Sequence, residues 1–419
     1  MSEKNHYQIL IIGGGAAGIT VAAQMKKKKP SVELAIIEPS ETHYYQPAWT
    51  LVGGGQYRVE KTARPEASVL PKGVTWIKDY AVKIDPDNNQ VTVQKGDVFT
   101  YDYLVVCPGI TIDWDKIKGL KECLGKNGVT TNYTKDTAPY TWELINNFKG
   151  GTAIFTFPAG AIKCPGAPQK IMYMADDIFR KNGVREKTHI IYANAMGKMF
   201  GVPAYNAPLE RVVERKQIEV RYGYNLIEIR GDKKEAVFAT TDGQTVTLNY
   251  DMIHVAPPMT TYDFIKQSPL ANEQGWVDVD QYTCQHKKYK NVFSLGDSSS
   301  LPTSKTAAAI RKEAPVVVAN ILALMEKKAP TETYNGYACC PLITGYGRVI
   351  LAEFDYNKQP LPSFPLDPTK ERYSMWLVKK YVLPWLYWNR MLKGEPFEPD
   401  MWRFLLPKNQ AVSATQVSQ

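Results

Sequence analysis

Near its N-terminus the chain reads Gln8–Ile12 (QILII), followed directly by Gly13–Gly18 (GGGAAG). The first run predicts a short apolar strand, and the residues after it predict a helix. A G-x-G-x-x-G motif between a strand and a helix is typical of a dinucleotide-binding fold. Gly13 permits a tight turn, Gly15 lets the backbone approach a pyrophosphate, and Gly18 lets the helix pack closely on the strand. The free N–H groups at the start of the helix would bind phosphate.

A second strand is expected over residues 33–37, and it ends at Glu38, about twenty residues beyond the last glycine. A carboxylate at this position accepts hydrogen bonds from ribose hydroxyls and disfavours a 2′-phosphate. The alternative is a glycine-rich turn that binds no nucleotide, and the presence of Glu38 argues against it.

Two later segments favour FAD over NAD as the bound nucleotide. Tyr101–Gly109 (YDYLVVCPG) resembles the strand and turn that make the second FAD contact in flavoproteins with two dinucleotide-binding domains. Asn291–Asp297 (NVFSLGD) resembles their late motif, in which the aspartate, Asp297 here, binds the ribityl chain. In this order the segments are typical of disulfide-reductase-like flavoproteins. The expected fold class is therefore α/β, with two Rossmann-like domains and Gly109 at the cofactor.

The middle of the chain lacks the second glycine motif with which such proteins bind NAD(P)H. Residues 151–157 predict the expected strand, but residues 158–168 (PAGAIKCPGAP) do not fit G-x-G-x-x-G. Their three prolines remove backbone donors where a pyrophosphate would need them. The next strand, residues 189–193, ends near Asn194 rather than at an acidic residue. We expect this domain to keep its fold without binding pyridine nucleotide.

Length and composition set further limits. The 419 residues are enough for two or three domains, and the net charge of +9 would suit an anionic substrate or anionic lipid. The basic run Lys26–Lys29 lies at the end of the first predicted helix, where it complements the dipole, so nucleic acid is not expected. Six cysteines do not make a disulfide scaffold, and no C-x₂-C and His spacing indicates a metal site. The polar start and the lack of an apolar run of about 18 residues predict a cytoplasmic protein, or a peripheral one on the cytoplasmic membrane face.

Further segments with unusual combinations of Cys, Pro, Gly and aromatic residues are spread over nearly the whole chain. They are His43–Pro47 (HYYQP), Trp49–Gly53, Phe155–Pro158, Lys163–Lys170 (KCPGAPQK), Pro302–Ala307 (PTSKTA), Cys340–Leu342, Thr344–Tyr346 and Val349–Asp355. Together they resemble the sulfide:quinone oxidoreductase family, in particular the subgroup that includes the mitochondrial enzyme.

The resemblance implies that Cys164 and Cys340 flank the flavin on its sulfide-facing side. Hydrosulfide attack on a cysteine pair leaves a persulfide on one sulfur and a thiolate on the other. By resemblance, Cys164 is the flavin-proximal thiolate and Cys340 carries the sulfane sulfur. A low thiolate pKa needs nearby positive charge, and Lys163 is adjacent in sequence, although its direction is left open.

The other four cysteines have structural interpretations. Cys107 ends a buried strand and is expected in the core, whereas Cys284 lies in a polar stretch and is expected near the surface. Cys339 adjoins Cys340, and vicinal cysteines rarely form the redox couple for steric reasons. Other family groups carry a third cysteine in the region of Cys123, whose setting does not match, so it is interpreted as a loop residue. Non-covalent FAD is expected for the same reason.

Quinone is the expected electron acceptor because the nicotinamide site is missing. The resemblance places Gln46 at the cofactor and Lys305 near the pyrimidine end of the flavin, where it would stabilise anionic reduced flavin and contact a quinone oxygen. A helix-start lysine facing water is the alternative for Lys305. Gly345, Tyr346 and Phe354 are expected to line the pocket for the quinone, either ubiquinone or menaquinone.

The segment Tyr373–Lys393 mixes aromatic and basic residues of the kind that suit lipid headgroups. Pro384 should divide it into two helical pieces or kink it. Met401–Leu406 is a second candidate. The segment is too charged and broken to span a bilayer, so a monotopic amphipathic anchor is expected. A core or dimer helix is the alternative.

The expected organisation is a first FAD half (1–112), a degenerate second domain (113–257), a second FAD half (258–330) and a C-terminal region (331–419). The expected activity is oxidation of hydrogen sulfide with quinone. Competing interpretations are a type II NADH:quinone dehydrogenase, a flavocytochrome-type sulfide dehydrogenase, and a flavin redox sensor with a regulatory disulfide. The sequence leaves open the sulfur acceptor, such as glutathione or sulfite, and whether the protein is a homodimer.

Overall fold

The computed structural model describes residues 5–396, and its first sheet contains the predicted dinucleotide-binding strand. The seven strands of this sheet follow the order β5-β2-β1-β8-β7-β6, and β19 pairs with β8. All pairs are parallel except β6–β7 and β7–β8. The strands are β1 (His6–Ile12), β2 (Leu34–Ile37), β5 (Val74–Ile77), β6 (Ala81–Asp85), β7 (Gln90–Val93), β8 (Val98–Val106) and β19 (Val292–Ser294).

Gly13 and Gly18 shape the turn from β1 into α1 (Ala16–Lys28). Gly13 has a φ of +105°, and a Cβ there would lie 2.5 Å from the carbonyl oxygen of Cys107. A Cβ on Gly18 would lie 1.9 Å from the carbonyl oxygen of Gly13. Only glycine fits either position, so the tight turn and the close helix packing have the physical cause that the sequence predicts.

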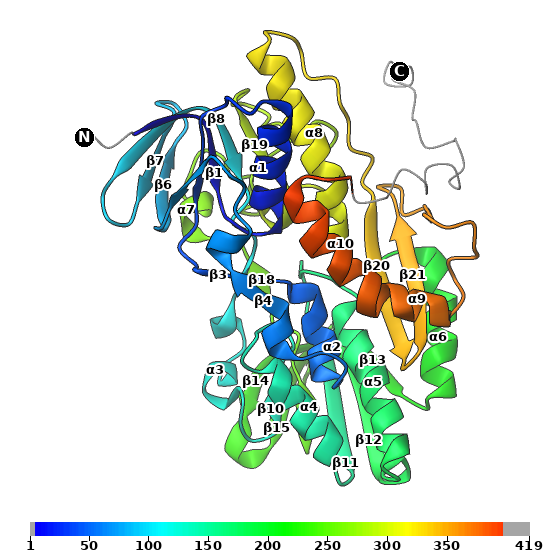
Figure 1. Ribbon diagram of the computed structural model, residues 1–419. Coiled ribbons are helices and arrows are strands. Elements are labelled where there is room, and N and C mark those ends of the chain that lie inside the picture. Colours follow the sequence, from blue (N-terminus) through cyan, green and yellow to red (C-terminus); the bar gives the residue numbers. More distant parts are fainter. Residues whose placement is uncertain (1–4, 397–419) are drawn as a thin grey trace.

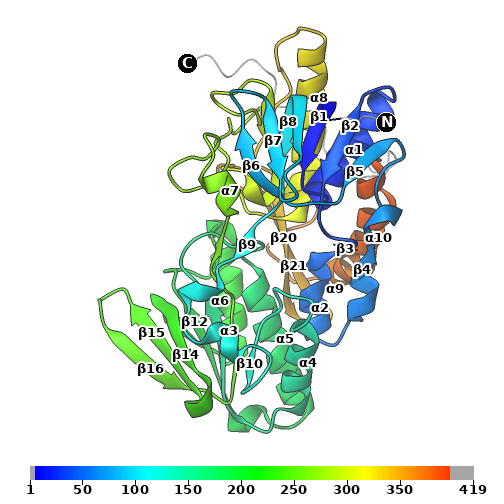
Figure 2. The same ribbon diagram turned by 90° about the vertical axis from the view of Figure 1, so that its left-hand side faces the viewer.

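The second sheet is parallel and has the order β10-β17-β11-β12-β13. A small antiparallel sheet, β14-β15-β16, projects beside it (Figure 2). The strands are β10 (Val129–Thr130), β11 (Gly151–Phe157), β12 (Thr188–Asn194), β13 (Glu219–Tyr222), β14 (Tyr224–Arg230), β15 (Glu235–Thr240), β16 (Thr245–Asn249) and β17 (Met252–His254). The helices are α3 (Leu120–Cys123), α4 (Ala138–Asn147), α5 (Ala167–Lys181) and α6 (Asn206–Arg215). The predicted α/β fold with two Rossmann-like domains is confirmed.

Two short strands pair where the chain passes between the sheets, namely β9 (Thr111–Ile112) and β18 (Met259–Thr260). The other elements of the first domain and its return are β3 (Thr42–Tyr44), α2 (Trp49–Gly53), β4 (Ala63–Pro65), α7 (Asp263–Lys266) and α8 (Ala307–Met325). The chain passes from the first domain to the second, and back again, at this strand pair. Ligands of such folds bind at the carboxyl ends of the parallel strands.

The C-terminal region is a hairpin of β20 (Ala338–Gly345) and β21 (Arg348–Phe354), followed by a helix that lies over it (Figure 1). The helix consists of α9 (Tyr373–Leu377), the π-helical turn η9 (Val378–Val382) and α10 (Leu383–Asn389), which follow one another directly. Pro384 therefore does not split the segment into separated helices. The widened turn before it accommodates the ring and the missing N–H, which an ordinary α-helical turn would not.

None of the helices within residues 5–396 has the length and apolar character needed to cross a membrane. The second candidate anchor, Met401–Leu406, lies outside the described residues.

Candidate active site

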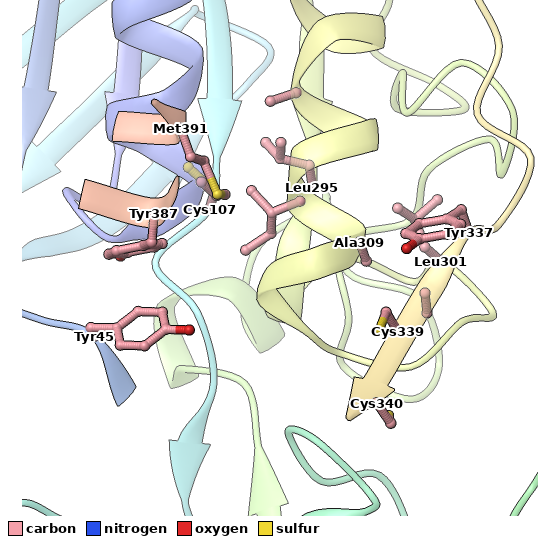
Figure 3. Close-up of a cluster of buried hydrophobic side chains, with 14 of the residues drawn as sticks. Tyr45, Cys107, Leu295, Leu301, Ala309, Tyr337, Cys339, Cys340, Tyr387 and Met391 are labelled. Carbon is pink, nitrogen blue, oxygen red and sulfur yellow. The ribbon is translucent and has the colours of Figure 1, made fainter. Parts of the chain in front are cut away.

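A cavity of about 820 Å³ is enclosed by all three parts of the chain. Its walls come from the turn after β1, the loop before α5, the β20–β21 hairpin and the C-terminal helix. Figure 3 shows Tyr45 and Tyr387 on the side of the C-terminal helix, and Cys339 and Cys340 on β20. The cavity therefore lies where the sequence predicts both the nucleotide and the sulfur chemistry.

The nucleotide end of this cavity has the features that FAD requires. Gly15 and Gly109 line it, and a Cβ on either would meet nothing within 4 Å, so the backbone is open to a ligand. Glu38 accepts hydrogen bonds from the N–H of Gly14 at 2.7 Å and of Ser40 at 2.8 Å. Burial raises the pKa of Glu38, and these two bonds oppose the shift. The residues fit an FAD whose pyrophosphate lies on the glycine turn and whose ribose lies at Glu38.

The same end of the cavity is tied to the C-terminal helix. The Tyr387 hydroxyl lies 2.6 Å from Nε2 of His43, and Nδ1 of His43 lies 3.2 Å from the carbonyl oxygen of Gly14. The rings of Tyr45 and Tyr387 are 4.6 Å apart. His43 thus links helix α10 to the glycine turn.

Cys164 and Cys340 are brought together from two different elements. Cys164 lies in the loop between β11 and α5 and has a φ of +52°, which is rare outside glycine. Its N–H donates to the carbonyl oxygen of Lys305 at 2.9 Å, which holds the loop against the second FAD half. Cys340 is fully buried on β20, and the two sulfur atoms are close enough to share a hydrogen bond.

Gly166 explains how the loop comes so close to the strand. A Cβ on Gly166 would lie 2.4 Å from Cδ2 of Leu342 and 3.6 Å from Cβ of Cys340. In the loop that lacks the second glycine motif, Gly166 therefore lets Cys164 come close to its partner.

Two buried lysines surround the sulfur pair. Nζ of Lys170, on the first turn of α5, donates to Sγ of Cys164 at 3.1 Å. Lys379, on η9, has an exposed fraction of only 3% and donates to the carbonyl oxygen of Pro47 at 2.9 Å. The hydrogen bond from Cys340 lowers the pKa of Cys164, and the charges of Lys170 and Lys379 lower it further against the effect of burial. The hydrogen bond to Cys164 and burial both raise the pKa of Cys340.

The lysines respond differently to this environment. Burial works against the charge of Lys170, but the sulfurs of Cys164 and Cys340 outweigh it and raise the pKa of Lys170. Burial and repulsion from Lys170 lower the pKa of Lys379 to about 7. In the reduced pair the thiolate is therefore favoured on Cys164 and the thiol on Cys340, with Lys170 as the counter-charge.

Lys163 does not supply the charge that its place in the sequence suggests. Its Nζ donates to Oε1 of Gln46 at 2.7 Å and lies 5.8 Å from the centre of the Trp49 ring. Sequence reasoning missed Lys170, although a residue three positions after Ala167 lies on the first turn of the helix that follows the cysteine loop. No sequence signal identifies Lys379, because it arrives from the distant C-terminal helix.

Lys305 and Asp297 lie together in the cavity wall. Nζ of Lys305 donates to the carbonyl oxygens of Asp297 at 2.7 Å and Ser299 at 3.0 Å. It also lies 4.0 Å from the centre of the Trp276 ring, so it does not face bulk water. Burial lowers the pKa of Lys305 to about 8, while Asp297 and Glu313 oppose the shift.

The expected quinone residues lie apart from the cavity. The N–H of Tyr346 donates to Asp177 at 2.8 Å, its hydroxyl donates to Gly54 at 2.6 Å, and it lines a separate pocket of about 460 Å³. A Cβ on Gly345 would meet the same Asp177 carboxylate, and Phe354 packs edge-on against Phe200. The three residues do not form one pocket, because Gly345 and Tyr346 lie at the far end of β20.

A different set of residues forms the apolar branch of the cavity. One face of the hairpin contributes Cys339, Pro341 and Leu351, whereas Cys340 points to the opposite face, toward α5. The C-terminal helix contributes Val378, Val382, Leu383 and Leu386.

Three other cysteines can be compared with their interpretations. Cys107 is buried in the core, as expected. Cys284 is fully buried, so the surface interpretation was wrong: its N–H donates to Asp280, and its carbonyl accepts from Ser294, in the packed layer under α8. Cys123 ends helix α3 rather than lying in a loop, and it packs in the core of the second domain, close to Gly231.

Comparison with known proteins agrees with this geometry. Residues 7–139 match the pyridine nucleotide-disulphide oxidoreductase family. The chain is 48% identical over 395 residues to a mitochondrial sulfide:quinone oxidoreductase of Mus musculus, covering 94% of this chain and 88% of the mouse protein. A mitochondrial sulfide:quinone oxidoreductase of Dictyostelium discoideum is 48% identical over 397 residues, with the same two coverages. This chain belongs to the sulfide:quinone oxidoreductase family.

A solved structure supports the same fold. The sulfide:quinone oxidoreductase of Aquifex aeolicus superposes with a TM-score of 0.80 at 22% identity, over 95% of this chain and 93% of that one. For this member of the sulfide:quinone oxidoreductase family, the predicted resemblance and fold class are thus confirmed.

Proposed function

We propose that this protein oxidises hydrogen sulfide to sulfane sulfur through Cys164 and Cys340 and delivers the electrons to a membrane quinone. The observation that carries the proposal is the pair of sulfurs in mutual contact, with Lys170 at 3.1 Å from Cys164, beside a cavity that fits FAD. A lone buried thiol would be inert, whereas this one is polarised for thiolate chemistry.

The cycle starts from a Cys164–Cys340 disulfide. Hydrosulfide attacks Sγ of Cys340, which forms a persulfide there and breaks the S–S bond, so that Cys164 leaves as a thiolate. Lys170 holds that thiolate through its contact with Sγ of Cys164. FAD in the cavity would take up the electron pair and pass it to the quinone.

Lys305 is proposed to hold negative charge at the pyrimidine end of the cofactor and at a quinone oxygen. Its position beside Asp297 and its burial support this role, because a fixed cation in a dry site acts strongly on developing charge. The apolar branch formed by Val378, Val382, Leu383 and Leu386 is proposed as the quinone pocket in place of Gly345, Tyr346 and Phe354.

Peripheral attachment to a membrane is proposed from the outer face of the same helix. Its large exposed apolar residues recur every four positions, as Tyr373, Leu377, Tyr381 and Trp385, with exposed fractions of 65%, 38%, 58% and 56%. Residues four apart lie on one face of a helix, so these four form a stripe that faces away from the hairpin. The sequence analysis placed Lys379 on the headgroup-facing surface. The structure instead buries it beside the cysteines.

The stripe gives a direct test of membrane attachment. Tyr381→Glu combined with Trp385→Glu should lower partitioning onto anionic lipid vesicles by about tenfold or more, because two large apolar side chains no longer enter the interface. Co-sedimentation with vesicles measures the effect. Tyr282→Glu is the matched control, since Tyr282 is 43% exposed on another part of the surface. Equal sedimentation of the double variant and the control would contradict the anchor.

The function itself is tested by anaerobic titration of the purified flavoprotein, first with sulfide and separately with NADH. Sulfide should bleach the flavin absorbance, and added quinone should restore it. NADH should leave it unchanged, because the loop before α5 carries Cys164 rather than a nucleotide-binding turn. Bleaching by NADH alone would assign the protein to NADH dehydrogenase chemistry instead.

A further inference from the structure

Glu313 is a buried carboxylate next to the turn that follows β19. It lies on helix α8 and has an exposed fraction of only 1%. One of its oxygens accepts a hydrogen bond from the N–H of Gly296 at 2.7 Å. Helix α8 contacts this turn, and Leu295, the residue before Gly296, lies beside the helix (Figure 3). Within residues 5–396, Glu313 is not one of the side chains that line the large cavity, so the cost of burying this carboxylate needs another explanation.

A short run of contacts connects Glu313 to Lys305, which does line the cavity. The N–H of Gly296 donates to Glu313. The next residue, Asp297, accepts at its carbonyl oxygen from Nζ of Lys305 at 2.7 Å, and the carbonyl oxygen of Ser299 accepts from the same Nζ at 3.0 Å. These two acceptors are neutral, so they orient the ammonium group without balancing its charge. The balancing charge comes from the carboxylates of Asp297 and Glu313.

Burial and charge oppose each other at both Lys305 and Glu313. Burial lowers the pKa of Lys305 to about 8, and the carboxylates of Asp297 and Glu313 limit that fall. Burial raises the pKa of Glu313 to about 7. The Gly296 N–H and Lys305 oppose that rise, whereas Asp297 adds to it. Glu313 and Lys305 therefore each favour the charged form of the other.

The other titratable groups that face Glu313 keep their protons. They are Cys284, Tyr334 and Tyr356. Burial raises the pKa of all three, and the charge of Glu313 raises it further. Among the residues that the structure describes, Asp297 and Lys305 are thus the charged groups to which Glu313 is coupled.

We propose that Glu313 is a positioning residue for the flavin site and that it acts by keeping the ammonium group of Lys305 protonated. The inference rests on the proposed function, in which Lys305 holds negative charge at the pyrimidine end of FAD and at a quinone oxygen. An uncharged amine in the same place would stabilise that charge far less. Glu313 therefore extends to higher pH the range in which electrons pass to quinone.

The test follows quinone reduction by the FAD-loaded, sulfide-reduced protein as a function of pH. In Glu313→Gln the alkaline limb of the pH–rate profile should move down by about one pH unit, because loss of an opposite charge lowers the pKa of Lys305. The rate near pH ~8 should fall about five- to tenfold. The midpoint potential of the bound flavin should fall as well, since less positive charge stabilises its reduced form. Glu313→Asp keeps the charge and should hold the limb close to its wild-type position.

Two comparisons separate this charge effect from a structural one. Lys305→Met should lack the alkaline limb, and adding Glu313→Gln to it should change the rate by less than about twofold, because Glu313 acts through Lys305. Asp79→Asn is the matched control. Asp79 is also buried, with an exposed fraction of 7%, and it accepts hydrogen bonds from the backbone N–H groups of Tyr80 and Lys95. Its replacement should leave the limb in place.

An alkaline limb that stays in place in Glu313→Gln would overturn the inference, and so would a further loss of rate when Glu313→Gln is added to Lys305→Met. Glu313→Ser decides the question if Glu313→Gln does not fold. Loss of FAD from both neutral variants would assign Glu313 to the folding of the turn and would also overturn the inference. Failure of sulfide to bleach the wild-type flavin would instead defeat the proposed function, so the two failures are distinguishable.

Discussion

Replacing either cysteine of the pair, as Cys164→Ser or Cys340→Ser, should slow the reduction of bound flavin by sulfide by roughly a thousandfold or more. Each substitution removes one sulfur of the electrophilic disulfide, so hydrosulfide has no S–S bond to attack, and a serine hydroxyl cannot replace it. The loss for the two single variants and the double variant should be similar, because residues that act as a unit are not additive. Anaerobic stopped-flow absorbance measures the rate.

Cys123→Ser is the control for this experiment. Cys123 is also a buried thiol, but it packs in the second-domain core, so its replacement should leave the rate within about twofold. A Cys340→Ser variant that retained wild-type bleaching would remove the pair from the mechanism. The FAD content of all variants should match the wild type, which separates a chemical defect from a folding defect.

Removing the charge of Lys170 should shift the pH dependence of the same reaction. Lys170 lowers the pKa of Cys164, so in Lys170→Met that pKa rises, and the thiolate forms only at higher pH. The rising limb of the pH–rate profile should move up by about one to two pH units, with a loss of roughly ten- to a hundredfold at neutral pH and recovery in alkaline buffer.

Lys163→Met distinguishes this explanation from a general loss of positive charge. Lys163 is the immediate neighbour of Cys164 in sequence, but its Nζ contacts Gln46 instead. Its replacement should leave the rising limb in place. A shift in Lys163→Met without one in Lys170→Met would contradict the assignment.

The first domain could be predicted in detail because its signals are local. The glycine turn and Glu38 each depend on one strand, one turn and one helix, and the structure places them as expected. Cys164 and Cys340 could also be singled out, but only from resemblance, since nothing local to either residue predicts their contact.

The structure does not bring the predicted quinone residues together at the large cavity. A strand advances about 3.3 Å per residue, so Gly345 lies about 16 Å along β20 from Cys340. Proximity in sequence to a reactive cysteine therefore did not mean proximity to its cavity. The alternation of side chains along β20 matters more, because it turns Cys339 and Pro341 into the cavity and Cys340 away from it.

Cys284 and Lys379 were misplaced for a related reason. Polar neighbours suggested exposure for Cys284, and a mixture of aromatic and basic residues suggested a headgroup-facing position for Lys379. Both side chains are instead buried. Burial of a single residue within a polar segment is decided by tertiary packing, which local composition does not report.

The helix from Tyr373 to Asn389 also determines how the protein can be prepared in solution. Truncation before Tyr373 would remove the exposed stripe that is proposed to face the bilayer. It would also remove Lys379 from the surroundings of Cys164 and Tyr387 from its contact with His43, and it would open the cavity to water. An inactive truncated sample would therefore say nothing about whether lipid is required. An active form that does not bind lipid has to be made by replacing only the exposed side chains of this helix. The side chains that line the cavity must be kept.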